Sequence, residues 1–253
     1  MTKAPGPIHE IPGWGTSAAQ ATPIDERLAA LARETVLEIG QRGRTGETAL
    51  ELAFSAMVLA DHVLDRFESE TPLPQPIVCR PGCDFCCYLQ VELTPPEALL
   101  LGRRIEENFS RDAKVRLLAS LERSWNLKAG KSKQEIARIR RELPCPLLRD
   151  RRCSVYPVRP LLCRAMHALD AGQCASASRS QDLAPVDHYA HRREFIIAIA
   201  KGLADGCRAL GCQCGSLDLT GAILDYFGEP KPAERWIMGE AVFRHLYPLP
   251  WEP

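Results

Sequence analysis

Four cysteines crowd the stretch CRPGCDFCC, at Cys79, Cys83, Cys86 and Cys87. No hydrophobic run separates them, so packing in an apolar core does not explain their spacing. Clustered thiols can pair as disulfides, bind zinc or bind an iron–sulfur cluster. The adjacent Cys86 and Cys87 point their side chains in different directions in most backbone conformations. Either one of the two is not a ligand, or each binds at a different site.

A second cysteine region lies roughly 50 residues further along the chain, an insertion that is tolerated because loop-closure entropy grows only logarithmically with length. The stretch CPLLRDRRCSVYPVRPLLCRAMHALDAGQC contains Cys145, Cys153, Cys163 and Cys174. We expect Cys145 and Cys153 to lie on loops and residues 161–168 to form a short helix. The eight cysteines of the two regions are the predicted metal ligands.

The spacing alone does not choose between zinc and iron–sulfur chemistry. Two tetrahedral zinc sites would use all eight thiols. One [4Fe–4S] cluster would use four thiols and leave the others structural or reactive. The first block contains no histidine, although zinc sites commonly mix histidine with cysteine, and this favours iron–sulfur. We therefore predict a [4Fe–4S] cluster, with Zn²⁺ as the alternative.

Arginines near the cysteines could neutralise such a site. Four thiolates around Zn²⁺, or around an oxidised [4Fe–4S] core, leave a net charge of about −2, whose burial requires cations or N–H donors. We predict that Arg80, Arg159 and Arg164 contact the cofactor, and a solvated loop position is the alternative for each. The other arginines of the second region are Arg149, Arg151 and Arg152.

The order of residues across both regions resembles the CxxCxxCC-type family of cysteine-cluster proteins, which are described as zinc- or iron-chelating. The matching features are Cys145-Pro146, Cys153, Tyr156-Pro157, Arg159-Pro160, Cys163-Arg164 and the helix start VELTPPEA at residues 91–98. The resemblance spans residues 75–175 and implies metal binding by the cysteines. One departure is the first gap, which has three residues rather than two between Cys79 and Cys83.

A competing pattern overlaps the first block. Cys79, Cys83 and Cys86, with Phe85 before the last, fit the C-x3-C-x-aromatic-C signature of radical S-adenosylmethionine enzymes. Those enzymes carry this loop after the first strand of a partial β/α barrel. The sequence here predicts helices on both sides of the block and no run of βα units. This enzyme class is therefore the less favoured alternative.

The composition is that of an ordinary globular protein, with 45% apolar and 25% charged residues among 253. Thirty-two basic residues balance 32 acidic ones, so net charge favours neither nucleic acid nor an anionic membrane as a partner. No stretch has the ~20 apolar residues of a membrane span. The first residues lack the layout of a signal peptide. We therefore expect a cytoplasmic protein, in which eleven cysteines favour metal or redox chemistry over disulfides.

Helices must position these cysteines, because apolar residues recur at helical spacing along most of the chain. The clearest start is at Thr94, which caps a helix with Pro95 in its first turn and Glu97 as capping-box partner. No alternating strand pattern of useful length is present. We therefore predict a mainly α fold with irregular, cysteine-bearing loops. The expected helices cover about residues 23–40, 48–71, 94–109, 111–141 (one or two helices), 161–168, 186–210, 218–227 and 232–246.

The predicted organisation has four segments. They are a flexible N-terminal arm (1–21), an N-terminal helical segment (22–74), a cysteine-cluster core with a helical insertion (75–175) and a C-terminal helical segment that packs on the core (176–253).

Some residues outside the two blocks could also do chemistry. His188 and His191 share a predicted helix face with Glu194, a pattern more typical of a polar surface than of a metal site. His167 is expected to pack or hydrogen-bond beside the cysteines. The last three cysteines are Cys207, which continues an apolar helix face and should be buried, and Cys212 and Cys214, which are either loop thiols or an accessory site.

Three kinds of function fit these features. A protein with a [4Fe–4S] cluster would have a redox or catalytic role. A structural zinc module would stabilise a helical scaffold that binds another protein. A metal carrier would need exposed, exchangeable thiolates. The excess of cysteines over one site favours the first or the third.

Overall fold

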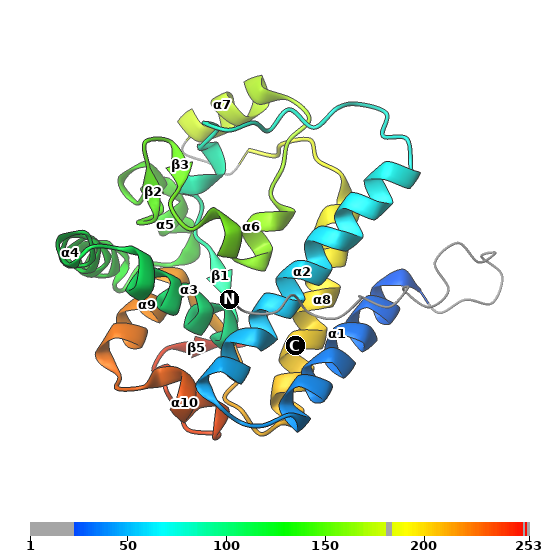
Figure 1. Cartoon of the computed structure of the whole chain (residues 1–253). Coiled ribbons are helices and arrows are strands. Elements are labelled where there is room, and N and C mark those ends of the chain that lie inside the picture. Colours follow the sequence, from blue (N-terminus) through cyan, green and yellow to red (C-terminus); the bar gives the residue numbers. More distant parts are fainter. Residues whose placement is uncertain (1–22, 181–183, 250, 252–253) are drawn as a thin grey trace.

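The computed structural model describes residues 23–180, 184–249 and 251 (Figure 1). These residues form ten α-helices, three short 3-10 helices and five strands of two or three residues, which confirms the predicted mainly α fold. The predicted arm, 1–21, lies outside the described residues. Within them, no helix is both long and apolar enough to cross a membrane, and no run of βα units is present.

The elements run in the following order. They are α1 (Ile24–Gln41), α2 (Gly46–Glu70), η1 (Phe85–Tyr88), β1 (Glu92–Leu93), α3 (Pro95–Asn108), α4 (Arg111–Lys128), α5 (Lys133–Arg138), η2 (Arg140–Glu142), β2 (Leu148–Arg149), β3 (Arg152–Cys153), η3 (Tyr156–Val158), α6 (Leu161–Ala165), α7 (Ala171–Arg179), α8 (Ala190–Ala209), β4 (Ser216–Asp218), α9 (Leu219–Gly228), α10 (Pro232–Ile237) and β5 (Leu246–Tyr247).

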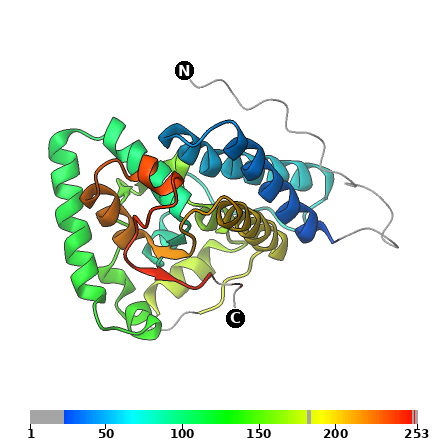
Figure 2. The ribbon, with the colours of Figure 1, turned by 90° about the horizontal axis from the view of Figure 1, so that it is seen from below.

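Two glycines let the helices α1 and α8 approach closely. A Cβ on Gly202 would overlap the carbonyl oxygen of Ala29, and one on Gly206 would lie 2.6 Å from the Cβ of Val36. Because the two glycines are four residues apart, they lie on one face of α8. Both views of the ribbon show α1 running alongside α8 (Figures 1 and 2). This pair and α2 form a helical wall, and α6, which carries Cys163, packs on α2 and α8 of that wall.

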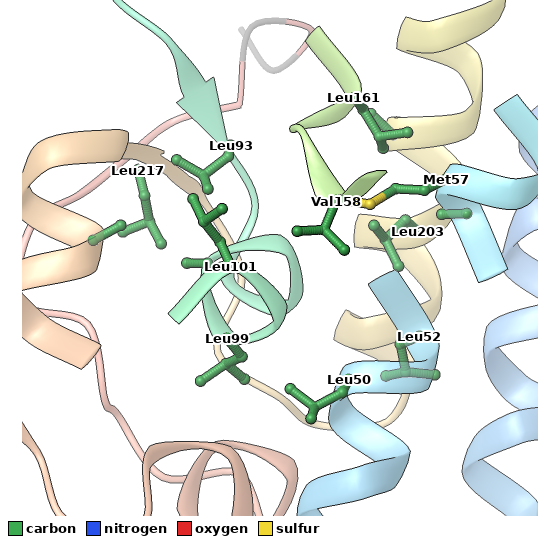
Figure 3. Close-up of a cluster of buried hydrophobic side chains, with 14 of the residues drawn as sticks. Leu50, Leu52, Met57, Leu93, Leu99, Leu101, Val158, Leu161, Leu203 and Leu217 are labelled. Carbon is green, nitrogen blue, oxygen red and sulfur yellow. The ribbon is translucent and has the colours of Figure 1, made fainter. Parts of the chain in front are cut away.

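The hydrophobic core joins that wall to the rest of the molecule (Figure 3). Met57 of α2 and Leu203 of α8 are almost completely buried and lie beside Val158 of η3, with Leu161 of α6 next to Met57. The helix α6, which carries Cys163, is therefore packed directly on the core. Burying each such leucine contributes about 2 kcal/mol, so the position of α6 is firmly fixed.

Two small antiparallel sheets were not predicted from the sequence. One has the strand order β1-β4-β5 and the other pairs β2 with β3. Strands of two or three residues are too short to show an alternating pattern. The first sheet joins the segment after η1 to the C-terminal part of the chain, through the pair Leu93 and Leu217.

Several predicted helix bounds were wrong for identifiable reasons. The helix α8 begins at Ala190 rather than near residue 186, because Asp187 is held in an extended segment by bonds to Leu169 N–H (2.9 Å) and to the Gln173 side chain (2.8 Å). The helix α10 ends at Ile237, since Gly239 adopts a φ of +91°. The helix α6 ends at Ala165, and α7 was missed altogether. The four predicted segments remain a prediction.

Candidate metal centre

The first cysteine block folds into a tight turn followed by a short helix. The N–H of Cys83 donates to the carbonyl of Arg80 (3.0 Å), across Gly82, whose φ of +88° disfavours any side chain. The N–H of Cys87 donates to the carbonyl of Asp84 (3.0 Å) and starts η1. Cys86 and Cys87 therefore lie on one helical turn, next to the turn that carries Cys83.

Backbone hydrogen bonds tie both ends of this block to the second cysteine region. The N–H of Cys145 donates to the carbonyl of Cys87 (2.7 Å), and the N–H of Val78 donates to the carbonyl of Ala168 (3.1 Å). Each of these bonds spans the whole insertion between the two regions. Backbone hydrogen bonds therefore bring the two cysteine regions into direct contact.

Cys145 lies on a loop as predicted, but Cys153 does not. Cys153 belongs to β3 and pairs with Leu148 of β2, whose N–H donates to the carbonyl of Cys145 (2.9 Å). A two-residue turn at Asp150 and Arg151 closes this hairpin. The hairpin therefore brings Cys145 and Cys153 to one place.

A glutamate from another helix fixes the position of Cys163. The N-cap of α6 is Pro160, which offers no side-chain cap. The N–H of Leu161 instead donates to the buried carboxylate of Glu97 (2.7 Å), which also accepts from the N–H (2.8 Å) and hydroxyl (2.6 Å) of Thr94. The predicted capping box at Thr94 is confirmed, and the same carboxylate caps a second helix.

Cys174 comes from α7, which packs against η1. Asp170 caps this helix by accepting bonds from the N–H groups of Gly172 and Gln173. The signal for α7 was present in the sequence, since Asp170 is a good N-cap residue, but the following run of small residues has no strong apolar face.

The thiols divide into two sets that meet at Cys86. We call Cys145, Cys153 and Cys163 the inner set and Cys79, Cys83 and Cys174 the outer set. Burial, and then the charges of neighbouring thiols including Cys86, raise the pKa of Cys163, and the same causes raise the pKa of Cys145 to about 11. Cys86 thus lies within charge-interaction range of the inner set.

The outer set shows the same relationship to Cys86. Burial, followed by the charges of Cys83 and Cys86, raises the pKa of Cys79. Burial, and then the charges of Cys79, Cys83 and Cys86, raise the pKa of Cys174. The hydrogen bond between Cys86 and Cys87 is the main cause that raises the pKa of Cys86 well above its ordinary value. A cation bound by these thiolates would lower all of these pKa values.

All eleven cysteines are free thiols, and Cys79 and Cys86 are exposed. Among the residues that the structure describes, no three His, Cys, Asp or Glu side chains converge as the ligands of a single ion. The donor set nevertheless fits a thiophilic metal, because every predicted ligand is a thiol and the predicted ligands approach one another from separate segments.

Comparison with protein-family models now places this region. Residues 78–182 match the CxxCxxCC family. Its model is described as a putative zinc- or iron-chelating domain, and the resemblance drawn from the sequence is thereby confirmed. No curated protein and no solved structure matches the chain.

The three predicted arginines take different places around the CxxCxxCC region. Arg159 stacks on Tyr156 (4.0 Å to the ring centroid), and its charge opposes the burial that raises the pKa of Cys153. Arg164 is buried and pairs with Asp61 of α2 and with the carbonyl of Pro157 (2.8 Å). Arg80 is exposed. Contact of these arginines with a cofactor remains a prediction, and Asp61 had no signal in the sequence.

The histidines near the CxxCxxCC region are engaged in structural contacts. His167 lies 2.8 Å from the carbonyl of Ala165 through Nδ1 and accepts from the N–H of Tyr189 through Nε2 (2.7 Å), as the packing interpretation predicted. The prediction that His188, His191 and Glu194 share one helix face was wrong, because α8 begins after His188. His191 instead lies 3.0 Å from Glu68 of α2.

Three cysteines lie outside the CxxCxxCC region. Cys207 is buried, as predicted, with only 1% of its surface exposed. Cys212 is also buried and lies 3.6 Å from a guanidinium nitrogen of Arg44. Cys214 lies 3.5 Å from the carbonyl of Ala204. These contacts are those of packed thiols, and an accessory site at Cys212 and Cys214 remains a prediction.

Proposed function

We propose that this protein holds a [4Fe–4S] cluster through cysteine thiolates and has a redox or catalytic role. The observation that carries the proposal is the junction of the two cysteine regions: the N–H of Cys145 donates to the carbonyl of Cys87 (2.7 Å), and the charges of Cys86, Cys145 and Cys153 act on the Cys163 thiol. These four thiols come from η1, a loop, β3 and α6, so they can approach a cofactor from several directions. Four thiolates are the ligand number of such a cluster.

The surroundings of these four thiols suit a buried anionic centre. Arg159 supplies a cation whose charge lowers the pKa of Cys153, and Cys145 and Cys153 pack against the hydrophobic core. A bound cluster would supply one-electron transfer, and the exposure of Cys86 would set how closely a reaction partner approaches it. The role of the protein chain is to orient the thiolates and to limit their contact with water.

Zinc is the second candidate, and one observation favours it. Cys86 and Cys87 are adjacent and lie where the inner and outer sets meet, so each could complete one set of three to a tetrahedral site. Eight thiols would then hold two ions, and the outer set, which the cluster proposal leaves without a metal, would gain a role. The two candidates therefore differ in their use of Cys174.

The test is anaerobic purification of the full chain, with visible absorption and analysis of iron, sulfide and zinc on the same sample. We expect absorption at about 400 nm, with about four irons and four sulfides per chain. Cys163→Ala should abolish the colour, whereas Cys174→Ala should retain most of it. Cys207→Ala is the matched control, because this thiol is buried outside both sets.

The alternative results are equally clear. A colourless protein with about two zincs per chain, reduced to about one by either Cys163→Ala or Cys174→Ala, would establish the two-ion arrangement instead. Colour that survives Cys163→Ala but not Cys174→Ala would move the cluster to the outer set. Loss of colour in Cys207→Ala would show that the variants act through folding.

A further inference from the structure

The hairpin β2–β3 contains two locally unfavourable features. Its turn places Asp150 at a φ of +48° and Arg151 at +59°. Two-residue hairpin turns with this geometry favour glycine or asparagine, and an arginine in the left-handed region is strained. Arg149 and Arg152 are also direct cross-strand partners, and like charges opposite each other destabilise a hairpin.

Three arginines of the hairpin lie on the surface, next to the segments that carry the cysteines. Arg149, Arg151 and Arg152 are all exposed. Arg149 lies over the ring of Phe109 (5.1 Å), and Arg151 reaches Asp84 of the first cysteine block (3.4 Å) while its side chain stays 67% exposed. The side chain of Arg152 makes no hydrogen bond or ion pair with any residue that the structure describes. Most of this positive charge therefore faces solvent.

Other arginines near the cysteine blocks stack on tyrosines. Tyr156, 59% exposed, lies three residues after Cys153 and carries Arg159 on its ring. Arg141 lies over the ring of Tyr88, which follows η1 residue Cys87. Tyrosine and arginine are the residues most enriched at the energetic centres of protein interfaces. Backbone strain that a glycine would relieve indicates that the arginine itself has a use.

We propose that the hairpin face, defined as Arg149, Arg151, Arg152 and Tyr156, docks an acidic surface of a protein partner beside the cysteine site. Carboxylates of the partner would neutralise the like charges of the cross-strand pair Arg149 and Arg152. This inference goes beyond the proposed function, since it holds whether the thiols bind iron or zinc.

Charge distribution favours a protein over a nucleic acid as the occupant. Nucleic-acid sites neutralise many phosphates along an extended basic groove, whereas the chain as a whole has as many acidic as basic residues. The hairpin face is small, the exposed Asp150 lies in its turn, and Arg151 pairs with Asp84. Such an alternation of charge is typical of a protein interface that selects its partner by complementarity.

The test measures binding of the full chain to a fluorescein-labelled polyglutamate peptide, and to a labelled single-stranded oligonucleotide of equal charge, by anisotropy at low salt. The triple variant Arg149→Gln, Arg151→Asn, Arg152→Gln should weaken peptide binding about tenfold, the sum of three exposed ion pairs. The matched control changes three exposed arginines elsewhere, Arg33→Gln, Arg116→Gln and Arg123→Gln, and should change peptide binding less than about twofold.

A single variant separates docking from folding. Arg151→Gly relieves the strained φ and should raise the melting temperature while weakening peptide binding about threefold. Equal weakening by the hairpin and control triples would overturn the proposal, because binding would then be non-specific. Tighter binding of the oligonucleotide with the same dependence on the hairpin, or no binding of the peptide by the unmodified chain, would also overturn it.

Discussion

The carboxylate of Glu97 accepts a hydrogen bond (2.7 Å) from the N–H of Leu161. Leu161 is the first residue of the five-residue helix that carries Cys163. Glu97 lies in α3, so one buried side chain caps its own helix and a second helix more than 60 residues away. So short a helix is not stable alone. The position of Cys163 therefore depends on a residue outside the cysteine motif.

Replacing Glu97 should destabilise the fold and the metal centre together. Glu97→Ala would leave the N–H groups of Thr94 and Leu161 without an acceptor in a buried place, at a cost of about 3 kcal/mol in the free energy of unfolding. Urea denaturation measures this cost. Glu107→Ala is the control, since that side chain is mostly exposed and its variant should lose less than about 1 kcal/mol. Equal losses in the two variants would contradict a dual capping role.

A second prediction concerns acid stability at the α2–α8 contact. Partial burial would raise the pKa of Glu68, but hydrogen bonds from Arg192 (2.6 Å) and His191 outweigh it and hold the pKa below its ordinary value of 4.5. The folded state therefore binds the proton less tightly than the unfolded state does. This contribution to stability is present above about pH 4.5 and is lost as the pH falls below it.

Glu68→Gln should accordingly be less stable than the unmodified chain at pH 7, and the difference should shrink as the pH is lowered below 4.5. Thermal unfolding measured from pH 7 down to pH 3 checks this. A difference in stability that stays constant over that range would show that the charge of Glu68 has no part in it.

Replacement by alanine should have opposite effects on stability at Gly202, which lies in the close contact of α1 with α8, and at Gly228, which lies outside it. Gly202→Ala would force a methyl group onto the backbone of Ala29, and overpacking of this kind costs about 2 kcal/mol. Gly228→Ala, at the end of α9, meets only the Arg244 side chain at 3.7 Å and should stabilise the fold by about 0.5 kcal/mol. Chemical denaturation of both variants gives the comparison, and a neutral Gly202→Ala would contradict the packing described.

Two lysines offer a comparison of a buried with an exposed ion pair. Lys128 is buried and donates to Asp218 (2.6 Å), Thr220 (2.9 Å) and Gln90 (3.1 Å). Lys128→Ala would leave Asp218 without its cation and should cost about 3 kcal/mol. Lys133, whose side chain is 90% exposed, pairs with Glu92, and Lys133→Ala should cost under about 1 kcal/mol. Guanidinium denaturation measures both costs, and similar values would show that burial of Lys128 adds nothing.

Local signals in the sequence predicted local structure well. Thr94, Pro95 and Glu97 lie within four residues, and the helix they start is present as predicted. The burial of Cys207 followed from the apolar face of α8. The hairpin at Asp150 and Arg151 could not be predicted, because arginine is not typical of the second position of a two-residue turn.

Grouping of the thiols required the tertiary structure. The sequence predicted eight ligands, but only the packing of η1 against α7, and the bond from Cys145 to Cys87, indicates which thiols are neighbours. Contacts between distant segments have no signature in a single sequence. The same holds for Asp61 and Glu97, whose bonds to α6 cross helices that are remote in the chain.

The glycine contact between α1 and α8 also has a consequence for the timing of folding. On the ribosome, α1 emerges long before Gly202, so its apolar face has no partner for on the order of 10–35 s of synthesis. During that interval α1 can pair with α2, and α2 can also pack against α3. The cysteine segments, which lie between α2 and α8 in the chain, must therefore leave the ribosome before the helical wall that supports them is complete. The emergence of α8 is therefore the step that allows this wall to form.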